Sequence, residues 1–166
     1  MPALARRITP FLWFDTQAEE AARFYTTVFE NARIKEITRY GAAGHDTHGM
    51  TAGAVMTVAF ELDGQGFVAL NGGPYFKFNE AISFQITCDT QDEIDYFWRV
   101  LSDGGEESRC GWLKDRFGLS WQVVPAILPH LLMGDDKAKC ERAMAALMQM
   151  KKLDIAALQR AHAGHA

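Results

Sequence analysis

Two histidines and an aspartate lie close together in a glycine-rich segment of the chain. His45 and His48 are three residues apart with Asp46 between them, and imidazole and carboxylate groups in such a pattern can bind zinc. The surrounding residues 40–53 contain four glycines, so we expect a surface loop in which neither strand nor helix fixes the geometry of the pair. We therefore prefer the interpretation that these residues form a loop that binds no metal. Whether the loop covers a pocket stays open.

The cysteines do not form a pattern that indicates chemistry. Cys88, Cys110 and Cys140 are odd in number and lie 22 and 30 residues apart (110 − 88 and 140 − 110), which fits neither a zinc knuckle nor a redox pair. Cys110 is the best candidate nucleophile, but no histidine is expected on a strand beside it. We expect reduced and mostly buried thiols.

A third group of residues could line a pocket for a small molecule. Aromatic side chains supply apolar walls in such pockets, and a few hydroxyl and amide groups orient the ligand. Aromatic strand residues also commonly fill a core, so each one has a structural alternative. The predicted ligand-binding residues are Thr9, Phe11, Trp13, Asn71, Phe76, Ser83, Gln85, Trp112 and Gln122.

A weak internal repeat positions these residues. Residues 8–14 form an apolar strand, followed by Asp15 and a segment with helical spacing of apolar residues; residues 82–88 and Asp89 begin a second copy. The offsets 82 − 8 and 89 − 15 both equal 74, which indicates two copies of one unit. Alternation along the first strand of each copy places every second side chain beneath the helix and the others on an open face.

After the helical segment of each copy, apolar and polar residues alternate with a period of two. This alternation predicts three further strands in each copy. They cover residues 32–38, 54–62 and 65–71 in the first copy and 106–108, 110–114 and 119–124 in the second. Asp63-Gly64 and Phe117-Gly118 supply turns. The predicted fold is α+β, with paired β-α-β-β-β modules at 1–74 and 75–125 and a C-terminal helical extension at 126–166 that docks on the modules or on a second subunit.

Composition limits the function classes. The 166 residues are 48% apolar and 23% charged, which is typical of a globular domain. The balance of 17 basic and 21 acidic residues gives a net charge of −4, so nucleic acid and anionic membranes are not expected as partners. No apolar run approaches the roughly 18 residues of a membrane-spanning helix, and a cytoplasmic location is expected.

Three separated motifs resemble a known family. Residues 8–14 (ITPFLWF), 70–74 (LNGGP) and 111–121 (GWLKDRFGLSW) are similar to those of the PhnB-like family, labelled 3-demethylubiquinone-9 3-methyltransferase, in the vicinal-oxygen-chelate or glyoxalase and bleomycin-resistance superfamily. The resemblance covers roughly the whole chain, including the helical extension. It implies modules that close around a cup, and a divalent metal held by the first and last strands of each module.

The four positions that the resemblance assigns to metal ligands carry weak donors here. They correspond to Thr9, Ala69, Ser83 and Gln122. Two hydroxyls, a methyl group and a carboxamide do not make a transition-metal site. We therefore expect no metal and no cofactor.

The expected function is a metal-free, aromatic-lined cup that binds a small, partly apolar ligand, in a protein that forms a homodimer. Whether it catalyses a reaction stays open. One alternative is a metal-dependent lyase, isomerase or dioxygenase that uses His45, His48 or Gln122. A methyltransferase, as the family label says, is less favoured, because neither 41–44 nor 71–74 is a glycine-rich turn that opens a helix.

Overall fold

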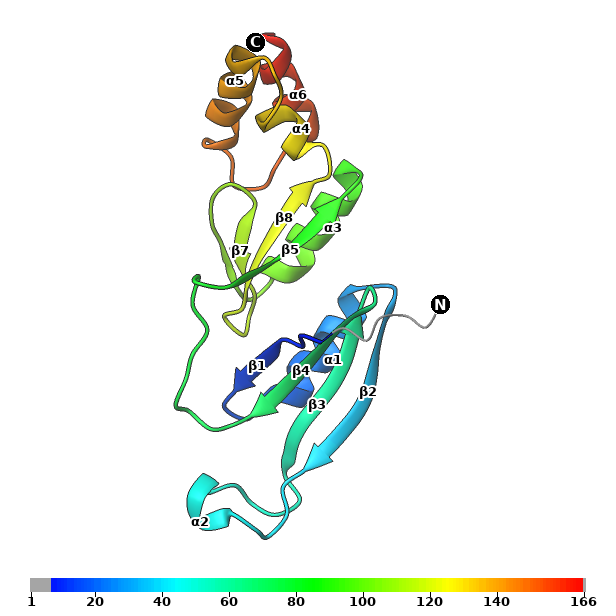
Figure 1. Cartoon of the computed structure of the whole chain (residues 1–166), viewed down its shortest axis with the longest axis vertical. Coiled ribbons are helices and arrows are strands. Elements are labelled where there is room, and N and C mark those ends of the chain that lie inside the picture. Colours follow the sequence, from blue (N-terminus) through cyan, green and yellow to red (C-terminus); the bar gives the residue numbers. More distant parts are fainter. Residues whose placement is uncertain (1–6, 166) are drawn as a thin grey trace. The chain divides into compact units, whose positions relative to one another are not determined.

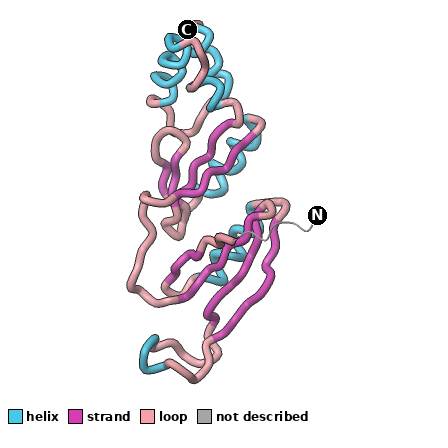
Figure 2. The backbone as a smooth tube through the Cα atoms, viewed as in Figure 1, coloured by secondary structure: helices cyan, strands magenta, loops and turns pink. Residues whose placement is uncertain are grey.

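The chain divides into two compact units. The computed structural model describes residues 7–165, and the first unit ends at Lys77 and the second begins at Phe78. Each unit contains one four-stranded sheet, and Figures 1 and 2 show that the C-terminal helices belong to the second. The fold class is the predicted α+β arrangement of two β-α-β-β-β modules with C-terminal helices.

The first unit is a sheet with one long helix. Its elements are β1 (Phe11–Phe14), α1 (Ala18–Val28), β2 (Ala32–Arg39), α2 (His45–His48), β3 (Val55–Leu62) and β4 (Gln65–Asn71). The strand order is β1-β4-β3-β2, with β1 parallel to β4 and the other pairs antiparallel. Asp63 and Gly64 both have positive φ, as a tight hairpin between β3 and β4 requires.

Residues 40–53 differ from the expected loop. They contain one turn of helix, α2, which begins after Gly44 and ends before Gly49, both in the left-handed conformation. Glycine adopts this conformation without the strain that a Cβ would cause. The expectation that no helix holds the two histidines is therefore wrong, and Gly44 directly precedes a helix, although a helix of one turn only.

The second unit repeats this plan with shorter strands. Its elements are β5 (Ser83–Cys88), α3 (Gln91–Ser102), β6 (Glu106–Glu107), β7 (Trp112–Lys114), β8 (Ser120–Pro125), α4 (Leu128–Leu132), α5 (Lys137–Leu147) and α6 (Ile155–Ala163). The strand order is β5-β8-β7-β6, with β5 parallel to β8. A capping box of Thr90 and Glu93 begins α3, and its apolar stripe of Ile94, Trp98 and Leu101 is buried.

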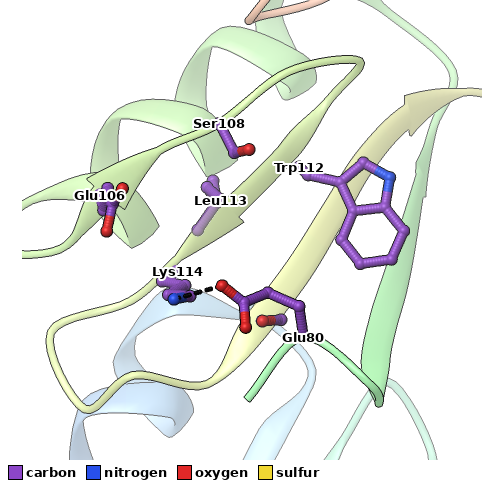
Figure 3. A pocket seen from close by; sticks show the side chains of 7 residues that line it. Glu80, Glu106, Ser108, Trp112, Leu113 and Lys114 are labelled. Carbon is purple, nitrogen blue, oxygen red and sulfur yellow. Dashed lines mark ion pairs between the residues drawn. The ribbon is translucent and has the colours of Figure 1, made fainter. Parts of the chain in front are cut away.

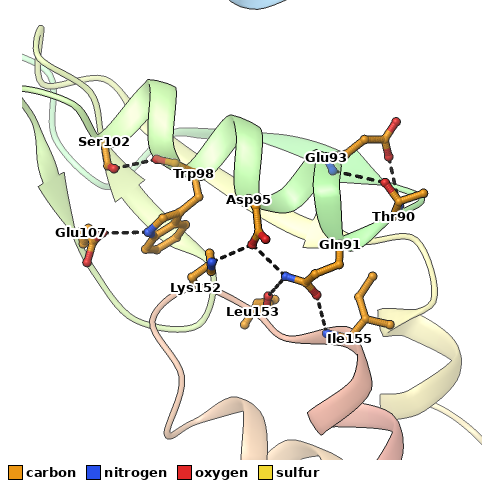
Figure 4. Close-up of polar contacts among 10 residues, drawn as sticks. All are labelled: Thr90, Gln91, Glu93, Asp95, Trp98, Ser102, Glu107, Lys152, Leu153 and Ile155. Carbon is orange, nitrogen blue, oxygen red and sulfur yellow. Dashed lines mark hydrogen bonds and ion pairs between the residues drawn. The ribbon is translucent and has the colours of Figure 1, made fainter.

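The C-terminal helices share a core with the second sheet. Val124 at the end of β8 belongs to one buried cluster with side chains of α4, α5 and α6. The Gln91 side chain at the start of α3 donates to the Leu153 carbonyl (3.0 Å) and accepts from the Ile155 amide (2.9 Å). Asp95 and Lys152 form an ion pair at 2.6 Å beside these bonds, as Figure 4 shows. Polar and apolar contacts together hold the helical extension against α3 and β8.

No helix within residues 7–165 has both the length and the hydropathy to cross a membrane.

Candidate functional site

The sheet of the second unit has a covered face and an open face. Leu113, Trp121 and Val123 are buried on the covered face. The indole of Trp98, on α3, donates to Glu107 of β6 (2.9 Å), so α3 lies over this face. Because side chains alternate along a strand, Trp112 and Gln122 lie on the opposite face.

Strand register arranges the open face in two rows. The first row runs across the four strands from β5 to β6, each residue opposite the next. It consists of Ser83 on β5, Ser120 on β8, Lys114 on β7 and Glu106 on β6. Gln85, Gln122 and Trp112 form the neighbouring row. The Ser108 amide donates to the Trp112 carbonyl (2.9 Å), which continues the second row beyond β7. Polar groups and one large aromatic ring therefore share a small area of sheet.

A cavity of about 230 Å³ opens over these rows. It is smaller than the roughly 300–1,000 Å³ of pockets that enclose a drug-sized ligand, so it fits a compact molecule or one end of a larger one. Figure 3 shows Lys114 directed at Glu80, with Trp112 and Glu106 on either side. The lining residues are Glu80, Glu106, Ser108, Trp112, Leu113, Lys114 and Ser120.

The pocket holds three charged groups. Lys114 forms a close ion pair with Glu80. The hydrogen bond from Lys114 lowers the pKa of Glu80, and the same bond raises the pKa of Lys114, with a further contribution from the charge of Glu106. Both partners are therefore charged at neutral pH, and Glu106 adds a second carboxylate that makes no ion pair within residues 7–165.

Two polar groups of the pocket have no partner in the described part of the chain. Ser120 is 1% exposed, and its Oγ has no hydrogen-bond partner, although burying an unpaired hydroxyl costs about 1–3 kcal/mol. The indole N–H groups of Trp13, Trp98 and Trp121 donate to Gly73, Glu107 and Asp115. The indole of Trp112, among residues 7–165, makes no hydrogen bond. The pocket is thus lined by a buried hydroxyl without a partner in residues 7–165 and by an indole ring.

The other predicted residues of the second unit lie on the open face. Gln122 donates through Nε2 to the Ser83 Oγ (2.9 Å), so these two side chains hold each other. Gln85 is exposed and lies 3.4 Å from the Thr87 hydroxyl. The structure brings Ser83, Gln85, Trp112 and Gln122 onto one face, as strand alternation predicts.

The open face of the first unit is aromatic. Phe11 is 63% exposed, and Thr9 is also exposed. The Trp13 indole donates to the Gly73 carbonyl (2.9 Å) and contacts Phe76 edge-on, with ring centroids 4.9 Å apart. These rings lie on the face opposite α1, because Leu12 and Phe14 are the buried residues of β1.

Ala69 and Asn71 lie on the covered face instead. Ala69 pairs with Leu12 and is fully buried, so its expected place in the cup is wrong by one residue of register. Asn71 is 5% exposed; its Oδ1 accepts from the Ala18 amide (2.8 Å) and its Nδ2 donates to the Val55 carbonyl (3.1 Å). Asn71 therefore supports the start of α1 and the start of β3, and we omit it from the proposed ligand contacts.

The histidines of α2 take part in their own loop. The Nδ1 of His48 accepts from the Met50 amide (2.9 Å), and its Nε2 lies 3.2 Å from the Ala43 carbonyl. His45 has only Asp46 nearby, at 3.8 Å. Within residues 7–165 no three His, Cys, Asp or Glu side chains come together as a possible metal site. Both nitrogens of His48 thus stabilise the turn.

The three cysteines form no disulfide. Cys88 is buried, whereas Cys110 and Cys140 are only partly buried, so the expectation of mostly buried thiols holds for Cys88 alone. Burial raises the pKa of the Cys88 thiol to about 12. This thiol is neutral at physiological pH and is not activated as a nucleophile.

The donors on the open faces do not fit a transition metal. Ser83 and Gln122 supply a hydroxyl and an amide that already bond to each other. On the first unit the open face carries Thr9 and, by register, Val68 and Leu70 beside Phe11 and Trp13. These hydroxyl, amide and hydrocarbon groups lack the imidazole, thiolate or carboxylate ligands that hold such ions. The pocket of the second unit also carries the carboxylates of Glu80 and Glu106, but Glu80 is paired with Lys114 and, within residues 7–165, no third His, Cys, Asp or Glu joins them.

We predict that protein purified without a histidine tag contains zinc, nickel and manganese only far below one ion per chain. Elemental analysis by mass spectrometry measures this directly. A chelator should also leave the thermal unfolding temperature unchanged, because no structural ion is lost. One tightly bound ion per chain would show that side chains of this protein do hold a metal.

Each unit presents a four-stranded sheet with one open face, polar in one unit and aromatic in the other. With this repeated arrangement the chain has a fold of the vicinal-oxygen-chelate class. The model of the family described as 3-demethylubiquinone-9 3-methyltransferase matches residues 6–124. The chain belongs to this family, which includes PhnB-like proteins. No curated protein matches the chain.

Solved structures share the fold, and one of them carries the same family description. A PhnB protein from Bacillus cereus that carries the same family description is 34% identical, with a TM-score of 0.65, and the match covers 73% of this chain and 100% of that one. A protein from Pseudomonas aeruginosa is 18% identical over 73% of this chain and 98% of its own, with a TM-score of 0.58. The fosfomycin resistance protein FosX from Listeria monocytogenes is 12% identical, and the match covers 77% of this chain and 97% of that one. Its TM-score is 0.52, so it shares the fold.

The family match ends at residue 124. The expectation that the resemblance includes the helical extension is therefore wrong: α4, α5 and α6 lie beyond the matched residues. These helices are an addition to the two modules in this chain.

Sequence reasoning missed most of the charged lining of the pocket. Lys114 and Ser120 lie in the predicted strands and share the parity of Trp112 and Gln122, so alternation could have placed them on the open face. Glu106 could have been placed in the same way once its pairing with Lys114 was known. Glu80 precedes β5 in an irregular segment, and no periodic signal indicates its position.

Proposed function

We propose that this chain binds a small, partly apolar ligand on the open face of its second sheet, without a metal. The observation that carries the proposal is the buried Ser120 hydroxyl, which lies without a partner in a cavity beside Trp112. A fold retains an unpaired buried polar group at a cost, and a ligand that bonds to it removes that cost.

Several side chains are proposed as ligand contacts. Apolar groups of a ligand can pack against aromatic rings, and amide and hydroxyl groups can orient it. In the second unit the proposed contacts are Ser83, Gln85, Trp112, Ser120 and Gln122. Thr9, Phe11, Trp13 and Phe76 offer an aromatic surface on the sheet of the first unit and are proposed as further contacts.

The experiment is a titration of the full-length protein with small amphipathic compounds, followed through the four tryptophan indole N–H signals by NMR. Ligands should shift the Trp112 signal and leave the Trp98 signal in place, because Trp98 bonds to Glu107 on the covered face. Trp112→Leu should reduce affinity at least tenfold, since it removes most of the aromatic contact. Compounds that bind while the Trp112 signal stays unchanged would contradict the proposal.

We also propose that the protein is a cytoplasmic homodimer. The three free thiols suit a reducing compartment, and Met133, Met144 and Met148 expose apolar surface on and beside the C-terminal helices. Exposed apolar surface of this kind commonly serves association. Light scattering at micromolar concentration should give twice the 18.6 kDa chain mass, and a mass of one chain would contradict the dimer.

A further inference from the structure

We propose that the ligand of the second unit's pocket carries a protonated amine, which binds between Glu106 and the Ser120 hydroxyl while its apolar part packs on Trp112. This inference rests on the proposed function and specifies the chemistry of its ligand. Four observations support it: the sign of the lining charge, the ion pair of Lys114 with Glu80, the Ser120 Oγ that has no partner within residues 7–165, and the half-buried ring of Trp112.

The lining of the pocket carries an excess negative charge. Glu80 and Glu106 are two carboxylates and Lys114 is one ammonium group, which leaves a net charge of −1. Strand register places Glu106 directly across from Lys114, and Glu80 bonds to the same lysine. A bound cation would balance the second carboxylate, whereas a bound anion would add a like charge near both.

Lys114 is not available as an anion site. Its ammonium group is already paired with Glu80, and its side chain is 32% exposed. An anionic ligand would have to displace Glu80 and then lie near Glu106. Strand register places Lys114 between Glu106 and Ser120, and its ion pair with Glu80 offsets the like charge that an ammonium ligand meets there. Such a ligand leaves this pair intact and gains a charge-assisted bond to Glu106.

Ser120 and Trp112 complete the recognition of an amine. Ser120 is 1% exposed, and its Oγ has no hydrogen-bond partner within residues 7–165. A hydroxyl oxygen can accept one ammonium N–H, which would give this buried group a partner. The ring of Trp112 lies in the neighbouring row of the open face. An indole face attracts a cation and also packs against hydrocarbon.

The test compares three compounds of similar shape and different charge on the full-length protein. The probes are 2-phenylethylamine, 2-phenylethanol and 3-phenylpropanoate, titrated at pH 7 and followed by the Trp112 indole signal. The amine should bind about tenfold more tightly than the alcohol, which is the effect of one hydrogen bond to a charged group. The carboxylate should bind more weakly than the alcohol.

Two single-charge variants assign the preference to the pocket. Glu106→Gln removes the carboxylate that faces the ligand and should bring the affinity of the amine close to that of the alcohol. Glu107→Gln is the matched control, because Glu107 is the next residue on the same strand and bonds to Trp98 on the covered face. A glutamine there still accepts that bond, so the preference for the amine should persist.

The outcomes separate this inference from the proposed function. If the alcohol or the carboxylate binds at Trp112 as tightly as the amine, the pocket binds a ligand but the amine inference is wrong. The inference is equally wrong if Glu106→Gln leaves the preference unchanged. If none of the probes, and no compound of the wider titration, shifts the Trp112 signal, the proposed function itself fails.

Discussion

Replacing Asp115 by alanine is expected to destabilise the second unit by about 3–5 kcal/mol. The carboxylate is 2% exposed. Its Oδ1 accepts from the amides of Phe117 (2.9 Å) and Leu119 (3.1 Å), and its Oδ2 accepts from the Trp121 indole (2.9 Å). Alanine would leave three donors without this acceptor in the turn that joins β7 to β8. Since both strands carry pocket residues, ligand affinity should fall as well.

Native-state hydrogen exchange of amides in β7 and β8 measures this loss of stability for the affected unit alone. Asp103→Ala is a suitable control, because Asp103 is an exposed aspartate of the same unit whose ion pair with Arg116 lies at the surface. Surface pairs contribute about 0–1 kcal/mol, so this control should change protection little. If both substitutions reduced protection equally, the buried Asp115 carboxylate would contribute no more to stability than the surface ion pair.

The second large effect is expected at Asn71. Asn71→Ala should lower the stability of the first unit by about 2–4 kcal/mol, because it leaves the Ala18 amide and the Val55 carbonyl without their partner. Buried polar groups that lose a hydrogen bond retain the full cost of desolvation. Hydrogen exchange of amides in α1 and β4, including Ala18 itself, should accelerate.

Ligand affinity at the pocket of the second unit should not change in Asn71→Ala, since the side chain makes its bonds inside the first unit. Asn31→Ala provides the control, because Asn31 is exposed and the change should stay within about 0.5 kcal/mol. If Asn71→Ala kept full protection against hydrogen exchange in α1 but lost ligand binding, Asn71 would be a ligand contact, as predicted from the sequence.

Much of the fold could be predicted because the repeat places polar and apolar residues with a clear period. The helices followed from apolar stripes such as Ile94, Trp98 and Leu101, and the hairpin followed from Asp63-Gly64. Those signals are local, so neighbours in sequence carry them. The faces of β5 could also be assigned, since alternation within one strand needs no knowledge of its partners.

Errors occurred where a position depended on pairing between distant strands. Ala69 was placed one residue out of register with β1, and a shift of one residue moves every side chain of a strand to the other face. The role of Asn71 depends on Ala18 and Val55, which come close only in the folded unit. Its amide side chain looks the same in sequence whether it caps a helix or holds a ligand.

The charged part of the pocket was missed for a related reason. Whether Ser120 has a partner is determined by the side chains on β5 and β7, and Ser83 beside it is occupied by Gln122. Glu80 reaches Lys114 from an irregular segment. A sequence pattern shows which face a residue takes but not which polar groups remain unpaired on it.

A crystal structure of the full-length protein grown with 2-phenylethylamine tests most directly whether the pocket of the second unit binds an amine without a metal. We expect the ring of the compound against Trp112, its nitrogen within hydrogen-bond distance of the Ser120 Oγ, and the Lys114–Glu80 pair intact. A compound bound elsewhere, with the Ser120 Oγ still without a partner, would contradict amine binding at this pocket. A metal ion coordinated by Gln122 or His48 would contradict binding without a metal.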